Sequence, residues 1–257
     1  MEEEIIIEPI VEEVKVIKEI IKKPRVNLDS WKPKTELGKK VKNKEITNID
    51  EILDNGYRIL EAEIVDALLP DLEVEIANIG QSKGKFGGGK RTLWRQTQKK
   101  TKEGNKPKFS AILIVGNKDG YVGMGRGKAK ETMPAKEKAL REAKLNIIKI
   151  KRGCGSWACN CREPHSIPFI VEGKCGNSRM KIMPAPKGTS LCTEKESKKI
   201  LQLAGVKDVY ANSEGHSMIN TLYACFDALK KLTKTKYSTD FGEKSGLVEG
   251  RLVKNDR

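Results

Sequence analysis

The run FSAILIVGNKDGYVGMGRGKAKE at residues 109–131 decides the fold of the central part of this chain. Residues 109–115 are apolar and rich in β-branched side chains, which is typical of a buried strand. Residues 117–120 (NKDG) end in Asp-Gly, which favours a hairpin turn, and residues 121–124 form the returning strand. We expect the glycines at 123, 125 and 127 to permit a tight change of direction after that strand. The run therefore predicts an antiparallel β-hairpin.

The segments on either side of the hairpin complete a small domain. Residues 72–79 alternate apolar and polar side chains, the period of a half-buried strand. Residues 132–148 carry Ala, Leu and Ile at helical spacing, and Pro134 suits the first turn of a helix. Three antiparallel strands and one helix predict an α+β domain over residues 71–150.

A second small α+β domain with a mixed sheet is predicted over residues 169–233. Thr193 is a candidate N-cap and Gly205 a candidate C-terminal stop for its first helix. The predicted elements are strands at 169–173 and 179–183, a helix at 193–204, a strand at 206–211 and a helix at 217–232.

The remaining segments are predicted to be peripheral. Residues 1–45 form an N-terminal extension, extended and basic at 24–44. Residues 46–70 are a helical lead-in of two helices, or of a helix and a turn, interrupted at Asn55-Gly56. Residues 151–168 are a cysteine-rich joint without periodicity, and residues 234–257 form a polar C-terminal tail.

The charge balance indicates an anionic partner. The chain has 50 Lys and Arg against 35 Asp and Glu, a net charge of +15. Thermophile proteins are also rich in Lys and Glu, but stability does not require such an excess of one sign. Residues 81–108 hold ten Lys and Arg against Glu103 alone, in a segment that we interpret as a flexible glycine-rich loop. Such a loop favours nucleic acid as the partner, because phosphates would neutralise it.

The residues predicted to contact phosphate lie mostly in this loop. Arg126, Lys128 and Lys130 lie near the start of the predicted helix, Lys187 lies in the turn PAPKG, and Trp94 or Phe86 is expected to stack on an unpaired base. The candidates within the loop are Lys83, Lys85, Lys90, Arg91, Arg95, Lys99, Lys100, Lys106 and Lys108.

Two glycine motifs suggest nucleotide binding but depart from the required patterns. Residues 84–91 (GKFGGGKR) resemble a phosphate loop, yet Arg91 replaces the Ser or Thr that binds Mg²⁺, and no apolar helical stripe follows. A small NTPase built on residues 84–92 is kept as an alternative. Residues 123–128 (GMGRGK) miss the dinucleotide fingerprint, because the third glycine comes one residue early.

Four metal-binding side chains cluster in the joint: Cys154, Cys159, Cys161 and His165, spaced Cys-x4-Cys-x-Cys-x3-His. Zinc takes four such ligands and could close a loop that has no core of its own. We expect one zinc ion here; the competing interpretation is that the thiols are free. Cys175, Cys192 and Cys225 are interpreted as small hydrophobic residues.

Targeting and catalytic signals are weak. No run of about 18 apolar residues is present, and the N-terminus is acidic where a signal peptide is basic. We therefore expect a cytoplasmic protein, without membrane contact, whose cysteines are reduced. Only His165 and His216 are available as histidines, and neither adjoins a nucleophile with an orienting carboxylate, so no catalytic residue is predicted.

The hairpin run, together with REAKLNIIKIKRG, PHSIPFIVEGKCG, MPAPKGT and LAGVKDV, resembles universal small-subunit ribosomal protein family five in its archaeal and eukaryotic form. The resemblance covers about residues 72–232. It implies an N-terminal domain like a double-stranded-RNA-binding domain and a C-terminal α+β domain of the family's own type. Three departures are a longer basic loop, Ser190 at a position where the family often has glycine, and Glu214 near the position of the Arg usually found before the last helix.

The same resemblance implies a structural, non-catalytic role. The protein would bind small-subunit rRNA near the decoding region and the mRNA entry channel, supporting assembly and translational accuracy. Its neighbours would be the small-subunit proteins of families three, four and eight, with mRNA close by. A zinc-dependent RNA-binding regulator outside the ribosome remains a further alternative.

Overall fold

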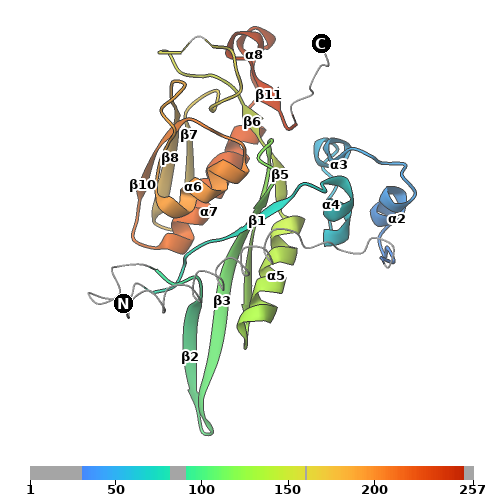
Figure 1. Ribbon diagram of the computed structural model, residues 1–257, viewed down its shortest axis with the longest axis vertical. Coiled ribbons are helices and arrows are strands. Elements are labelled where there is room, and N and C mark those ends of the chain that lie inside the picture. The colour runs from blue at the N-terminus through green and yellow to red at the C-terminus, as the bar shows by residue number, and fades with distance from the viewer. Residues whose placement is uncertain (1–30, 82–90, 160, 252–257) are drawn as a thin grey trace, which may run out of the picture.

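The structure, a computed structural model, describes residues 31–81, 91–159 and 161–251, and it contains two α+β units (Figure 1). The first unit is built on a five-stranded sheet and the second on a four-stranded sheet. The predicted two-domain α+β architecture is therefore confirmed. Most of the predicted N-terminal extension lies outside the described residues. None of the described helices has the length and apolar character needed to cross a membrane.

The predicted hairpin is the centre of the first sheet. At its turn, the Asn117 side-chain oxygen accepts hydrogen bonds from the backbone N–H groups of Asp119 at 2.8 Å and Tyr121 at 3.1 Å. The sheet has five strands rather than three, because residues 95–101 extend it along β3 and residues 147–149 form a strand instead of ending the helix. Every pairing is antiparallel. The strands are β1 (Glu73–Ile76), β2 (Arg95–Thr101), β3 (Gly104–Gly116), β4 (Tyr121–Ala129) and β5 (Ile147–Lys149).

The three glycines of β4 do not turn the chain, as the sequence pattern predicts, but face a helix. They alternate along the strand, so all three point toward α5 (Thr132–Leu145), which presents Ala135, Ala139 and Ala143 on its inner face. A Cβ atom on Gly123, Gly125 or Gly127 would meet the α5 backbone at less than 3.0 Å. Glycine on the strand and alanine on the helix therefore allow the two backbones to pack unusually closely.

The second unit has the predicted mixed sheet, in the order β7-β8-β10-β9. The β9 strand pairs parallel with β10, and the other pairings are antiparallel. Gly205 ends the first helix in a left-handed conformation, with φ +82°, as predicted. The predicted cap was wrong, since Glu194 is the N-cap and the Thr193 hydroxyl is buried without a hydrogen bond among the described residues. The elements are β7 (Val171–Cys175), β8 (Ser178–Pro184), β9 (Leu191–Cys192), α6 (Lys195–Leu203), β10 (Val209–Glu214) and α7 (Met218–Lys234).

One hydrophobic core joins the two units. Ile112, Ile114, Val122 and Met124 lie on the face of the first sheet opposite α5 and belong to the same buried cluster as Leu203 and the other apolar residues of α6. Gly116 comes so close to α6 that a Cβ atom there would meet the Leu203 backbone. The units are therefore packed against each other through the second face of the first sheet.

The N-terminal lead-in forms helices where the sequence predicts them, and one more. Besides α3 (Ile49–Asp54) and α4 (Ala62–Leu68), residues predicted to be an extended linker form α2 (Glu36–Lys42). The Thr35 hydroxyl caps α2 by accepting from the Gly38 N–H at 3.1 Å. The buried Glu61 carboxylate accepts from Trp31 Nε1 and from the backbone of Thr35, so a contact distant in sequence fixes this segment.

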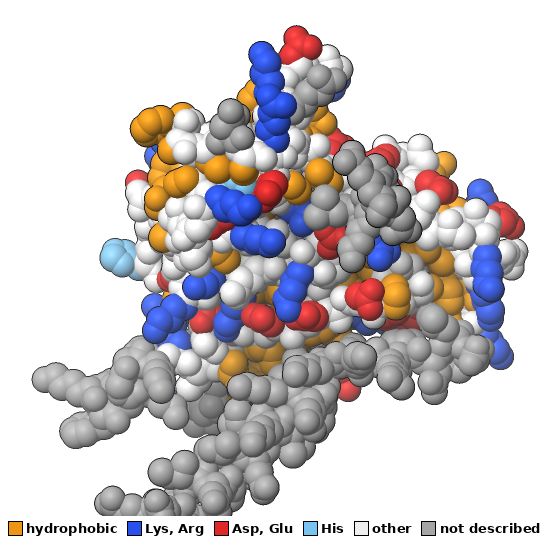
Figure 2. Space-filling model, turned by 45° about the horizontal axis from the view of Figure 1, so that its top comes forward, with side chains coloured by type: hydrophobic (Ala, Val, Ile, Leu, Met, Phe, Trp, Pro, Cys, Tyr) orange, Lys and Arg blue, Asp and Glu red, His pale blue; other side chains and the backbone are white. Residues whose placement is uncertain are grey.

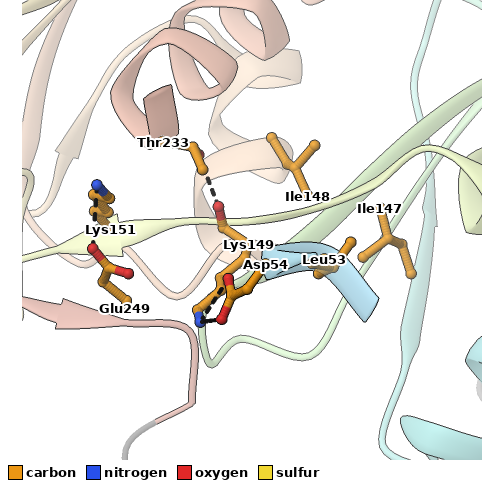
Figure 3. A pocket seen from close by; sticks show the side chains of 8 residues that line it. All are labelled: Leu53, Asp54, Ile147, Ile148, Lys149, Lys151, Thr233 and Glu249. Atoms are coloured by element: carbon orange, nitrogen blue, oxygen red, sulfur yellow. Dashed lines mark hydrogen bonds and ion pairs between the residues drawn. The ribbon is translucent and has the colours of Figure 1, made fainter. Parts of the chain in front are cut away.

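The C-terminal segment is not the peripheral tail that its polar composition predicts. Helix α8 (Thr239–Ser245) is followed by β11 (Val248–Glu249), which pairs with β6 (Lys151–Arg152) of the joint. Figure 3 shows the hollow beside this pairing, in which Lys149 meets Asp54 of α3 at 3.1 Å and Lys151 meets Glu249 at 3.2 Å. Its lysines and carboxylates bind one another, so this hollow holds segments of the chain together.

Candidate nucleic-acid interface and metal centre

The basic segment predicted to be a flexible loop is largely a β-hairpin. From Arg95 onward, β2 pairs with β3 residue by residue to a tight turn at Thr101–Gly104. Figure 1 shows this hairpin extending away from the rest of the molecule. Its outer part is exposed on both faces, so no apolar stripe marks it in the sequence, and ladder hydrogen bonds rather than burial maintain it.

The pairing register brings most of the predicted RNA-contacting residues onto one face. In strand pairs, directly opposed residues share a face and successive residues alternate. Lys99 opposes Lys106, Thr97 opposes Lys108, and Ser110 opposes both Arg95 and Lys128. We call this surface the basic sheet face; it comprises Arg95, Lys99, Lys106, Lys108, Arg126 and Lys128.

The basic sheet face lies on the same side of the first sheet as the apolar residues of the common core. Nearer the body, Ile112, Ile114 and Met124 are buried under α6, and farther out the same face is exposed and cationic. Of the six residues of the basic sheet face, only Lys106 has an ion pair with another described residue, Glu103, at 2.7 Å. Acidic side chains lie among the basic ones on the face in Figure 2, seen with the top of Figure 1 brought forward. Five of the six residues of the basic sheet face therefore carry a positive charge without an ion pair in the described part of the chain.

The remaining predicted RNA contacts are dispersed. Lys100 lies on the opposite face of the hairpin, since it opposes Asn105. Lys130 is exposed just beyond β4. Lys187 is elsewhere, bound to Glu163 at 2.7 Å beside the cysteine cluster. Lys83, Lys85, Lys90 and Phe86 lie outside the described residues.

A polar hollow adjoins the base of the hairpin. It is lined by Arg91, Arg95, Gly80 and His216, together with the first residues of α7. Helix N-termini present unpaired N–H groups and a partial positive charge, and here two guanidinium groups are close by. The hollow therefore combines several donors suited to a phosphate. Trp94, by contrast, is half-buried and packs against the hydrophobic cluster between the first sheet and α5.

The structure around the two glycine motifs does not suit nucleotide binding. A phosphate loop must lead into a helix, but the chain after Arg91 enters strand β2. The glycines of the second motif face α5 within β4, and the sheet is antiparallel, whereas a dinucleotide site needs a βαβ unit. These glycines serve packing instead.

The four predicted metal-binding residues are brought together. An antiparallel bridge between Gly153 and Ser166 closes the base of the loop that carries them, with N–H to carbonyl distances of 2.9 and 3.0 Å. The three sulfur atoms and a ring nitrogen of His165 all lie within 4.8 Å of one another, and Cys159 Sγ is 3.8 Å from His165 Nε2. Cys154 and His165 are buried, while Cys159 and Cys161 are half-buried.

The surroundings of the cluster favour a thiolate at its outer side. The Lys187 backbone N–H and the neighbouring Cys161 lower the pKa of Cys159 to about 6. Burial and the Cys161 side chain raise the pKa of Cys154 to about 11. The outer thiol therefore ionises more readily than an ordinary cysteine, and the buried one less readily.

Two residues near the cluster were not predicted from the sequence. Asp208 Oδ2 is 2.9 Å from His165 Nδ1, although the two residues are 43 positions apart, and nothing in the spacing indicates the pair. Trp157, a residue of the same loop, is 99% exposed to solvent. Its position between Cys154 and Cys159 is the sequence feature that could have drawn attention to it.

Comparison with known proteins agrees with this architecture. Residues 94–151 match the family described as "Ribosomal protein S5, N-terminal domain", and residues 173–240 match "Ribosomal protein S5, C-terminal domain". A relative from Nanoarchaeum equitans, named "Small ribosomal subunit protein uS5", is 51% identical over 89% of this chain and 99% of its own length. The chain belongs to the ribosomal protein S5 family. Proteins of this family are structural components and not enzymes.

Further archaeal relatives extend the comparison. Proteins with the same name from Methanocaldococcus jannaschii and Methanothermobacter thermautotrophicus are 47% and 45% identical, over 89% and 82% of this chain and 100% and 92% of their own lengths. Within this S5 chain, the N-terminal match includes the basic sheet face, whereas residues 152–172, with the whole cysteine cluster, lie between the two matched regions.

Proposed function

We propose that this S5 chain is a structural constituent of the small ribosomal subunit in the cytoplasm and that it binds small-subunit rRNA through the basic sheet face. The observation that carries the proposal is the set of six cationic side chains that β2, β3 and β4 align on one exposed face. Arg95, Lys99, Lys108 and Lys128 have no ion pair within the described part of the chain. Side chains so placed repel one another until an anionic polymer neutralises them.

The geometry favours contact with a backbone rather than with base edges. The hairpin is a two-stranded ribbon whose cations follow its length, an arrangement suited to contact with a run of phosphates. The hollow at Arg91, Arg95 and His216 offers a further phosphate position at the base of the same hairpin. Contacts of this kind fix position and orientation, as a structural ribosomal protein requires.

The finer placement rests on the family resemblance. We infer that the first unit is related to double-stranded-RNA-binding domains, a view supported by the antiparallel order of β1, β3 and β4 with α5 packed on one face. We further infer that the protein lies near the decoding region and the mRNA entry channel, beside small-subunit proteins of families three, four and eight. The relatives' shared name, "Small ribosomal subunit protein uS5", supports the same assembly.

The proposal is tested by removing charge from the basic sheet face. In one variant Lys99, Lys106, Lys108 and Lys128 are changed to Ala, and binding to purified small-subunit rRNA is titrated at several salt concentrations. Each phosphate contact contributes about 0.7–0.9 to the slope of log affinity against log salt, so the slope should fall by about 3.

A matched control removes four exposed lysines elsewhere, Lys39, Lys40, Lys234 and Lys236, and should leave the slope within about 1 of the parent value. Equal loss of slope in both variants would show that only total charge matters, and the assigned face would be wrong. Co-sedimentation of the full chain with small subunits at high salt separates a ribosomal protein from a regulator outside the ribosome, which would dissociate.

A further inference from the structure

We propose that Cys154, Cys159, Cys161 and His165 bind one zinc ion that fixes the joint between the two units. The four donor atoms lie within 4.8 Å of one another. Zinc–sulfur bonds of about 2.3 Å in a tetrahedron place the ligand atoms about 3.7 Å apart, so only small side-chain rotations bring all four into coordination. Three thiolates and one imidazole leave no open position, which is typical of a structural site.

The histidine is held in the orientation that a metal ligand needs. Asp208 Oδ2 lies 2.9 Å from His165 Nδ1, and this hydrogen bond directs Nε2 toward the cysteines. Metal-bound histidines commonly have such a carboxylate partner. Asp208 is itself fixed, because its other oxygen accepts from the Ser190 N–H at 2.8 Å and from the Gly188 N–H.

The fixed carboxylate connects the site to the second unit. Ser190 has φ +65°, a backbone conformation that favours glycine. In this conformation its N–H group donates a hydrogen bond to Asp208. The His165 carbonyl accepts from the N–H groups of Lys207 and Asp208 at 2.8 and 3.1 Å. On the other side, the Cys154 N–H donates to the Ser245 carbonyl of α8 at 2.8 Å. A metal ion here would tie α8, the joint and the start of β10 together.

The loop depends on a cross-link of this kind because it has little hydrophobic core of its own. Among the described residues between Gly153 and Ser166, the buried side chains are those of Cys154, Ser156 and His165, and Trp157 projects fully into solvent. Metal binding to a short loop of this kind contributes directly to its folding. Tetrahedral sulfur and nitrogen donors favour zinc over the hard cations, which prefer oxygen.

The first experiment measures metal in the full chain, purified without added metal, by elemental analysis. About one zinc per chain is expected, and replacement by Co²⁺ should give the absorption of a tetrahedral cobalt–thiolate site. Less than about a tenth of an equivalent of zinc, with no cobalt–thiolate band on adding Co²⁺, would overturn the proposal. A Cys154–Cys161 disulfide detected by thiol counting would also overturn it.

Variants then assign the ligands. The Cys159→Ser and Cys161→Ser double variant should lose the metal, and the Cys192→Ser control, which removes an exposed thiol outside the cluster, should retain it. Asp208→Asn tests the positioning role, because loss of an outer hydrogen bond typically weakens metal affinity about 10–100-fold. Competition with a chelator measures that change. Full zinc retention in the double variant would reject the assignment, and the wild-type cobalt spectrum decides the question even if the variant does not fold.

Discussion

Replacing Gly125 by alanine should destabilise the first unit strongly, although alanine is the smallest possible change. The added Cβ would lie 2.7 Å from the Glu142 carbonyl carbon and closer still to Ala143 N and Ala139 O, all three of them backbone atoms of α5. Ordinary contact begins at 3.4 Å, so the Glu142 carbon alone would have to retreat by about 0.7 Å, and α5 would have to move farther still to clear Ala143 N and Ala139 O. A gap of that size forfeits a quarter to a half of the dispersion energy of each contact that it opens.

Overpacking of a core costs about 1–3 kcal/mol, and we expect the upper end because backbone atoms cannot rotate away. For a chain of this length, about 3 kcal/mol corresponds to a fall in Tm of roughly 6–12 °C. Thermal unfolding of the full chain followed by circular dichroism measures it. Gly242→Ala is the matched control: Gly242 lies in α8, and its added Cβ would meet only the Tyr237 side chain. A Gly125→Ala Tm equal to that of the control would refute the packing argument.

Two further predictions concern buried charges. Burial alone would raise the pKa of Glu61, but hydrogen bonds from Thr35, Lys34 and Trp31 outweigh it and lower the pKa below 4.5. The stability that the ionised carboxylate gives to the folded state is therefore complete above pH 4.5 and is lost as the pH falls through the folded-state pKa. Glu61→Gln should therefore reduce the difference in urea midpoint between about pH 6 and pH 3, and an unchanged difference would contradict this. Lys144 and Asp66 form a buried pair at 2.7 Å. Lys144→Met should cost about 3 kcal/mol and adding Asp66→Leu should recover most of it, whereas a double variant no better than the single one would refute the pairing.

The parts of the fold with a local signal were predictable from the sequence. The apolar runs of β3 and β4, the turn at Asn117 and the glycine stop at Gly205 follow from side-chain period and backbone preference, which act within a few residues. The cysteine cluster was also predictable, because its four residues lie within one short loop. Strand β2 was not, since both of its faces are exposed and no hydrophobic period marks it.

The sequence by itself determined the class of partner and the organisation into two α+β units, because charge and periodicity are properties of the chain before it folds. Only the tertiary structure decided which lysines share a face, since that depends on the register between β2, β3 and β4. It also decided the role of the β4 glycines and the pairing of His165 with Asp208. The strand register and the glycine contacts depend on how neighbouring segments pair and pack, and the His165–Asp208 pair joins positions 43 residues apart, so no local pattern in the sequence records them.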